Sequence, residues 1–132
     1  MRMAHRLLLV EDNPDDQFLF KRALRDVPGL HIDVAGNGQE AVDYLYSREQ
    51  DPPGLVLLDL KMPQMGGIEA LRLVREKEAL ASIPIVIFTS SNEPADIAEA
   101  MECKATDFVQ KPVDFQRYNG TVRSLVRQYM GL

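Results

Sequence analysis

Five short runs of apolar residues, separated by segments with helical spacing, constrain this chain more than any other feature. The runs are Leu7–Val10, Ile32–Ala35, Leu55–Leu58, Ile83–Phe88 and Phe108–Val109. Three of them are continuous rather than alternating, which is typical of strands buried on both faces of a parallel sheet. Such strands need helices on both sides, so the pattern predicts an α/β fold.

The segments between the runs predict five helices. The clearest start is Asn13-Pro14-Asp15-Asp16, where Asn caps the helix, Pro takes its first position and the acids face the positive end of the dipole. We expect Phe18, Leu19 and Ala23 on its apolar face and its end near Pro28-Gly29. The other helices are expected at Gln39–Ser47, Gly67–Lys77, Glu93–Cys103 and Asp114–Met130.

Five alternating pairs of strand and helix predict one open, doubly wound sheet. A length of 132 residues suits a single domain, so we expect residues 1–132 to form it, with nothing left for an effector domain. The net charge of −5 disfavours non-specific binding to DNA or anionic membranes. No apolar run approaches the roughly 18–20 residues of a membrane span. A single cysteine, Cys103, excludes an internal disulfide, and we expect a cytoplasmic protein.

Polar residues follow four of the five apolar runs. They are Glu11-Asp12 after the first, Asp59 after the third, Thr89 after the fourth and Lys111-Pro112 after the fifth. Each has a plain alternative as a loop acid, a turn former or a solvated lysine. Ligands of doubly wound sheets bind outside the carboxyl ends of the strands, however, and these residues should meet at that edge.

Four motifs together resemble the bacterial response-regulator receiver domain, in the right order and over essentially the whole chain. They are Leu8–Asn13, Leu57–Gly67, Phe88–Ser91 and Phe108–Pro112. The start, Val10–Pro14 with Asp16 following, also resembles the small single-domain regulators that partner phytochrome-type sensor kinases. The resemblance implies a flavodoxin-like, five-stranded parallel sheet of order 2-1-3-4-5 with five helices, like that of the chemotaxis regulators.

The resemblance also implies a function in a two-component system or phosphorelay. Asp59 would accept a phosphoryl group from a sensor histidine kinase or a histidine phosphotransfer protein, and the modified surface would bind a different effector protein. The protein would not be an enzyme beyond assisting its own phosphorylation and dephosphorylation. Mg²⁺ would be needed, and Asp12, Asp59 and the backbone carbonyl of Lys61 would bind it directly, with Glu11 acting through water.

The remaining roles are also implied by the resemblance. Lys111 would contact one phosphoryl oxygen, and the Thr89 hydroxyl would donate to another. Thr89 and Phe108 would form the switch, in which Thr89 moves inward and Phe108 rotates into the vacated space. The Lys111–Pro112 peptide bond is expected to be cis, as in the family.

Several positions depart from the family pattern. Lys104 stands where a glycine usually ends the fourth helix, so we expect this lysine to have a positive φ. The resemblance implies that Lys61 and Ser91 occupy positions that would govern the lifetime of the phosphoryl group. Pairing through the fourth and fifth helices is common in the family, but Thr121 and Gln128 stand where the dimeric transcription-factor branch has arginines, so a homodimer stays open.

Three other classes of protein share part of this pattern. A haloacid-dehalogenase-type phosphatase would need a second Asp two residues after Asp59, where this chain has Lys61. A flavodoxin would need a phosphate loop rich in glycine and hydroxyl groups after the first strand. A degenerate receiver that works only as a protein-binding scaffold is the serious alternative, although it typically lacks one of the site residues. His5, His31 and Cys103 have no partners at metal-ligand spacing and are expected to be structural.

Overall fold

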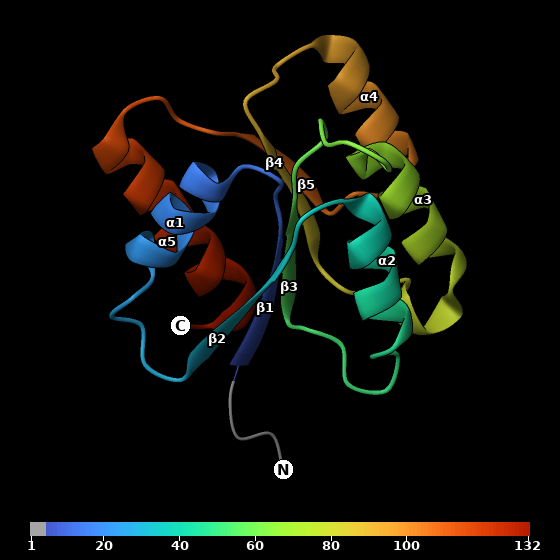
Figure 1. Cartoon of the computed structure of the whole chain (residues 1–132), viewed down its shortest axis with the longest axis horizontal. Helices are drawn as coiled ribbons and strands as arrows, with labels where there is room; N and C mark the ends of the chain where they lie inside the picture. The colour runs from blue at the N-terminus through green and yellow to red at the C-terminus, as the bar shows by residue number, and fades with distance from the viewer. Residues whose placement is uncertain (1–4) are drawn as a thin grey trace.

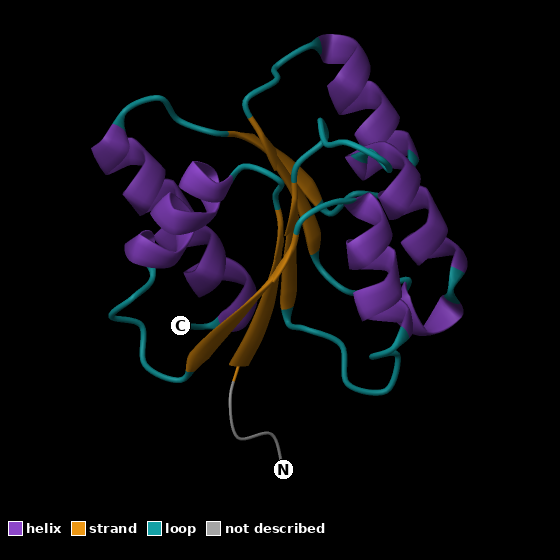
Figure 2. Cartoon of the chain, in the orientation of Figure 1, coloured by secondary structure: helices purple, strands orange, loops and turns teal. Residues whose placement is uncertain are grey.

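The computed structural model describes residues 5–132, which form a five-stranded parallel sheet covered by helices on both faces (Figures 1 and 2). The strands are β1 His5–Val10, β2 Leu30–Ala35, β3 Leu55–Leu58, β4 Ile85–Thr89 and β5 Asp107–Gln110. The helices are α1 Pro14–Ala23, α2 Gly38–Tyr46, α3 Gly67–Glu76, α4 Pro94–Glu102 and α5 Phe115–Met130, with a 3₁₀ turn, η1, at Glu78–Leu80. The strand order β2-β1-β3-β4-β5 confirms the predicted fold.

The sheet separates two apolar cores. Helices α1 and α5 lie on one side of it, and α2, α3 and α4 lie on the other (Figure 1). Successive side chains of a strand point to opposite faces, so Leu7 and Leu9 pack with the α1–α5 core whereas Leu8 and Val10 pack with the α2–α4 core. All four are buried, which explains why the run that encodes β1 is continuously apolar.

Helix α1 begins as predicted but has a different buried face. The Asn13 side chain accepts hydrogen bonds from the N–H groups of Asp15 (2.8 Å) and Asp16 (3.2 Å). The prediction that Phe18 faces the core is wrong, because its side chain is 64% exposed and Phe20 is fully buried instead. Residues two positions apart lie about 200° apart around a helix, so burying Phe20 turns Phe18 to solvent.

The ends of the helices agree with the sequence prediction in most cases. Helix α1 is the exception, since it ends at Ala23 and not near Pro28-Gly29. Helices α2 to α5 agree to within one residue at each end. Lys104, just after α4, has a φ of 70°, which confirms the predicted left-handed residue.

All five strands run in the same direction, so their carboxyl ends meet at one edge of the sheet, at the top of Figure 1. The loops that leave this edge carry the polar residues singled out from the sequence. No helix within residues 5–132 is long and apolar enough to cross a membrane.

Candidate functional site

The backbone of the sheet brings the predicted site residues together. The Asp59 N–H donates to the Val10 carbonyl (3.1 Å), which places Asp59 beside the end of β1. The Lys111 N–H donates to the carbonyl of Thr89 (2.7 Å), which places Lys111 beside the end of β4. Residues from the two ends of the chain therefore share one edge because of the strand register.

The Asp59 carboxylate is buried and held on both oxygens. Its Oδ1 accepts the Thr89 hydroxyl at 2.7 Å, and the Lys61 N–H lies 3.5 Å from the same oxygen. Its Oδ2 lies 3.3 Å from the Lys111 ammonium. Thr89 is only 1% exposed, so its hydroxyl has little access to water and is committed to this carboxylate.

Glu11 is the most deeply buried acid of the site, at 2% exposure. Its Oε1 lies 2.5 Å from the Lys111 ammonium, and its Oε2 accepts the Asn13 N–H at 3.1 Å. Burial raises the pKa of the Glu11 carboxyl to about 7, although Lys111 and the Asn13 N–H act in the opposite direction.

Lys111 joins three carboxylates. Its ammonium contacts Glu11 (2.5 Å), Asp16 (3.2 Å) and Asp59 (3.3 Å), and its side chain is 11% exposed. Burial alone would lower the pKa of Lys111, but these acids outweigh it and raise the pKa above its ordinary value. Lys111 is therefore a permanent positive charge among the carboxylates at the carboxyl ends of the strands. We call this region, with Glu11, Asp12, Asp16 and Asp59, the acidic edge.

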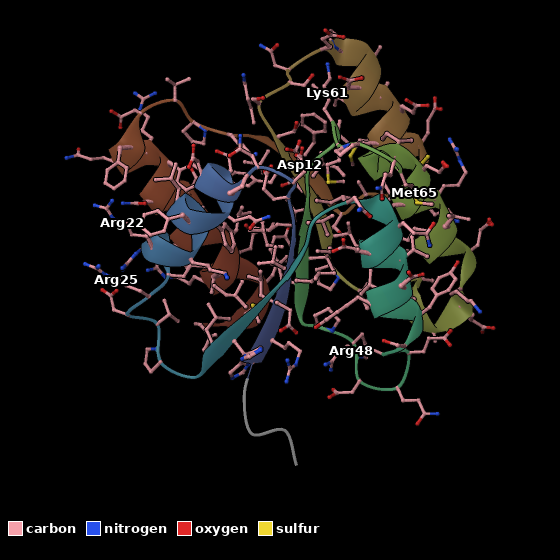
Figure 3. The ribbon with its side chains drawn as sticks, in the orientation of Figure 1. Asp12, Arg22, Arg25, Arg48, Lys61 and Met65 are labelled. Atoms are coloured by element: carbon pink, nitrogen blue, oxygen red, sulfur yellow. The ribbon has the colours of Figure 1, made fainter. Side chains whose placement is uncertain are left out.

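Asp12 completes an acidic cluster. Carboxylate oxygens of Glu11, Asp12 and Asp59 lie within 4.8 Å of one another, and Asp12 is the exposed member. Within residues 5–132 its carboxylate makes no hydrogen bond or ion pair. Figure 3 shows Asp12 at the carboxyl end of β1 and Lys61 on the loop after β3. None of His5, His31 and Cys103 belongs to this cluster.

Two other predicted features lie next to the cluster. Phe108 is half-buried on β5 and packs against the α2–α4 core. The Lys111–Pro112 peptide bond is trans, so the cis prediction is wrong. Trans is the more stable form of an X–Pro bond by about 0.5–1 kcal/mol, and the cis assignment rested on the family resemblance alone.

The first turn of α1 contributes contacts that the sequence analysis did not assign to the site. Asp16 reaches Lys111, and the Gln17 amide nitrogen donates to the Glu11 carbonyl at 2.7 Å. Asp16 is the third residue of a helix capped by Asn13, so its side chain points back toward the strand end. This spacing of Asp16 from the Asn13 cap was the sequence feature that could have placed its side chain near the strand end.

A surface groove of about 930 Å³ lies elsewhere, along β5 and α5. It shares Lys111 with the acidic edge, but none of Glu11, Asp12 and Asp59 lines it. Convergent charges and buried polar contacts, rather than depth, therefore define the candidate site.

Comparison with known proteins identifies the family. Residues 7–123 match the sequence profile described as "Response regulator receiver domain", and the chain belongs to this family. It is 32% identical to the probable methanogenesis regulatory protein FilR2 of Methanothrix harundinacea, over 95% of this chain and 83% of that protein. Other curated relatives are longer, and the chain spans 16% of one and 51% of another.

Solved structures of similar fold agree with this assignment. The phosphorylated cyanobacterial phytochrome response regulator RcpA superposes with a TM-score of 0.90 at 25% identity, over 96% of this chain and 94% of that one. The receiver domain of the sensor histidine kinase PA1611 from Pseudomonas aeruginosa, solved with magnesium in its active site cleft, gives a TM-score of 0.79 at 25% identity. That match covers 98% of this chain and 99% of the other.

Proposed function

We propose that this chain accepts a phosphoryl group on the Asp59 carboxylate and that the modification changes which proteins its surface binds. The observation that carries the proposal is the setting of Asp59, between the Thr89 hydroxyl at 2.7 Å and the Lys111 ammonium at 3.3 Å. The donor would be a sensor histidine kinase or a histidine phosphotransfer protein, and the output would be an effector protein. The similarity to a phytochrome response regulator favours a phytochrome-type kinase.

In this reaction an Asp59 oxygen forms a bond to phosphorus while the bond from phosphorus to the donor's histidine nitrogen breaks. The nitrogen leaves with the electron pair, and the product is an acyl phosphate. Protein carboxylates ionise near pH 4 in water, so the attack needs no general base. It needs alignment and positive charge, which the Thr89 hydroxyl and the Lys111 ammonium supply.

A divalent cation fits the donors at this edge. Hard cations prefer carboxylate and carbonyl oxygens, and Asp12 is an exposed carboxylate that the Lys111 ammonium does not contact. Asp12, Asp59 and the Lys61 carbonyl would hold the cation, with Glu11 acting through water. When bound, it would neutralise charge on the transferring group. The magnesium ion in the PA1611 receiver domain supports Mg²⁺ as the metal.

Thr89 and Phe108 form the proposed switch. The Thr89 hydroxyl now donates to the carboxylate that would be modified, so it would turn to a phosphoryl oxygen after transfer. Phe108 is half-buried on the neighbouring strand, at a position paired with Ile87 of β4, and it would repack as Thr89 moves. Phosphorylation then biases two arrangements of the same packed residues.

The test is labelling by acetyl phosphate in the presence of Mg²⁺, followed by intact-protein mass spectrometry. The wild type should gain one phosphoryl group, and Asp59→Asn should gain none, because an amide does not form the acyl phosphate. Asp15→Asn, an exposed residue on the same edge, is the matched control and should be labelled normally. Equal labelling of Asp59→Asn and wild type would contradict the assignment, and an unlabelled wild type would favour the scaffold alternative.

A further inference from the structure

We propose that Asp16 is the exchangeable partner of Lys111, which holds the ammonium in the unmodified protein and releases it to the phosphoryl group. This inference rests on the proposed phosphorylation of Asp59. It gives Asp16 a positioning role, because Asp16 acts on the phosphoryl group only through Lys111.

The ammonium of Lys111 is fully occupied. A lysine has three N–H donors, and three carboxylates surround this one, with contacts of 2.5 Å to Glu11, 3.2 Å to Asp16 and 3.3 Å to Asp59. A phosphoryl oxygen can become a partner of Lys111 only if one of these contacts is given up.

Exposure decides which contact is given up. The side chain of Glu11 is 3% exposed, and that of Asp16 is 38% exposed. Releasing Glu11 would leave a buried carboxylate without its cation, which is strongly unfavourable, whereas a released Asp16 is hydrated by solvent. Asp59 remains at the site because it is bonded to the phosphoryl group, so of the other two partners of Lys111 only Asp16 can leave at low cost.

The first turn of α1 keeps Asp16 within reach. Its N–H donates to the Asn13 side chain at 3.2 Å, and Gln17 of the same turn donates to the Glu11 carbonyl at 2.7 Å. The cap and the Gln17 contact together hold the first turn of α1 beside Glu11, the residue that follows β1. The Asp16 carboxylate then competes with a phosphoryl group for one cation, and it lowers the affinity of the site for that group.

Binding of beryllofluoride, whose beryllium becomes tetrahedral when a carboxylate oxygen bonds to it and so resembles a phosphoryl group, tests this competition. ¹⁹F NMR titrations with Mg²⁺ would compare the wild type, Asp16→Asn and Asp15→Asn. The two variants lose the same charge from the same helix turn, but the exposed Asp15 side chain does not contact Lys111. We expect Asp16→Asn to bind about two- to five-fold more tightly than wild type, as suits one part-exposed ion pair. Asp15→Asn should bind like wild type.

Two further measurements separate positioning from a general structural effect. In the metal-free protein, the ¹⁵Nζ resonance of Lys111 should shift in Asp16→Asn and stay unchanged in Asp15→Asn. Asp16→Glu, which restores a carboxylate, should return the beryllofluoride affinity toward that of wild type. Equal affinities for Asp16→Asn and Asp15→Asn, or weaker binding by Asp16→Asn, would overturn the inference. A wild type that binds no beryllofluoride would overturn the proposed function itself.

Discussion

Asp33 lies on the edge strand β2 and does not belong to the acidic edge. Its carboxylate makes hydrogen bonds with side chains of β1, of α2 and of β2 itself. Its carboxylate accepts from Arg6 of β1 (2.9 Å) and from Tyr44 of α2 (2.5 Å), and its Oδ1 lies 2.8 Å from a ring nitrogen of His31. His31 lies on the same strand as Asp33, and its expected structural role stays a prediction. Burial alone would raise the pKa of Asp33, but these contacts outweigh it and lower the pKa below its ordinary value.

A lowered pKa in the folded state means that ionised Asp33 stabilises the fold above the pKa of the unfolded chain, and that this contribution is lost as pH falls through the folded pKa. Asp33→Asn should therefore lower the free energy of unfolding by about 1 kcal/mol near neutral pH. The difference from wild type should begin to shrink as pH falls below about 4, the ordinary pKa of an Asp in the unfolded chain, and should disappear only below the lower pKa of the folded state. Urea unfolding at a series of pH values measures this, with the exposed Asp43→Asn as control. A difference that grows in acid would refute the account.

At the scale of residues, the sequence predicts which groups meet but not every contact between them. Glu11, Asp59 and Lys111 could be placed together because each follows a parallel strand and the strand ends share an edge. The spacing of Asp16 from the Asn13 cap predicts that its side chain lies near the strand end, but the contact with Lys111 itself also depends on how α1 is rotated against the sheet. The same rotation buries Phe20 and exposes Phe18.

At the scale of elements, the end of α4 shows how one residue departs from the family pattern without changing the fold. The Lys104 N–H donates to the Met101 carbonyl and the Ala105 N–H donates to the Ala100 carbonyl, both at 3.0 Å. This is the Schellman arrangement, and its left-handed position, normally a glycine, is Lys104 with a φ of 70°. The guanidinium of Arg75 donates to the Lys104 carbonyl at 2.9 Å, which fixes the turn from the α3 side.

Lys104→Gly should stabilise the protein. A side chain in the left-handed region costs roughly 1–2 kcal/mol, and glycine's greater freedom in the unfolded chain offsets part of the gain. We expect a net gain of about 0.5–1 kcal/mol in urea unfolding. The Arg75 contact is kept, because it is made to the backbone. Lys104→Ala is the matched control, since it removes the charge but keeps the Cβ. A glycine variant no more stable than the alanine variant would show that the left-handed backbone carries no strain.

How well each helix or turn could be predicted from the sequence depends on its length and on the residues at its ends. The starts of α1 and α5 were predicted to within one residue, because Asn13 and Asp114 bond to the first backbone N–H groups of these helices. The turn η1 at Glu78–Leu80 was missed, because three residues are too few to show a periodicity. The strand order came from the family resemblance, since the apolar runs alone do not state which strands are neighbours.

At the scale of the whole molecule, the acidic edge concentrates negative charge around one cation. Four carboxylates, from Glu11, Asp12, Asp16 and Asp59, lie around the single ammonium of Lys111, in a chain whose net charge is −5. Repulsion among these acids opposes folding, and only Asp12 of the four lacks a contact with Lys111. A cation that binds this edge in the folded state alone should therefore stabilise the entire domain.

Thermal unfolding with and without millimolar Mg²⁺ measures this coupling between site and fold. At saturation the metal should stabilise the wild type by about 1–3 kcal/mol, as expected for a ligand that binds only the folded state. Asp12→Ala should show almost no response, and without metal it should melt at or above the wild-type temperature because one repelling charge is gone. Asp15→Ala removes a neighbouring charge outside the cluster and should respond like wild type. Samples matched in ionic strength with KCl exclude general screening. If Asp12→Ala and wild type respond equally to Mg²⁺, the cation does not bind at the carboxylates that the strands bring together.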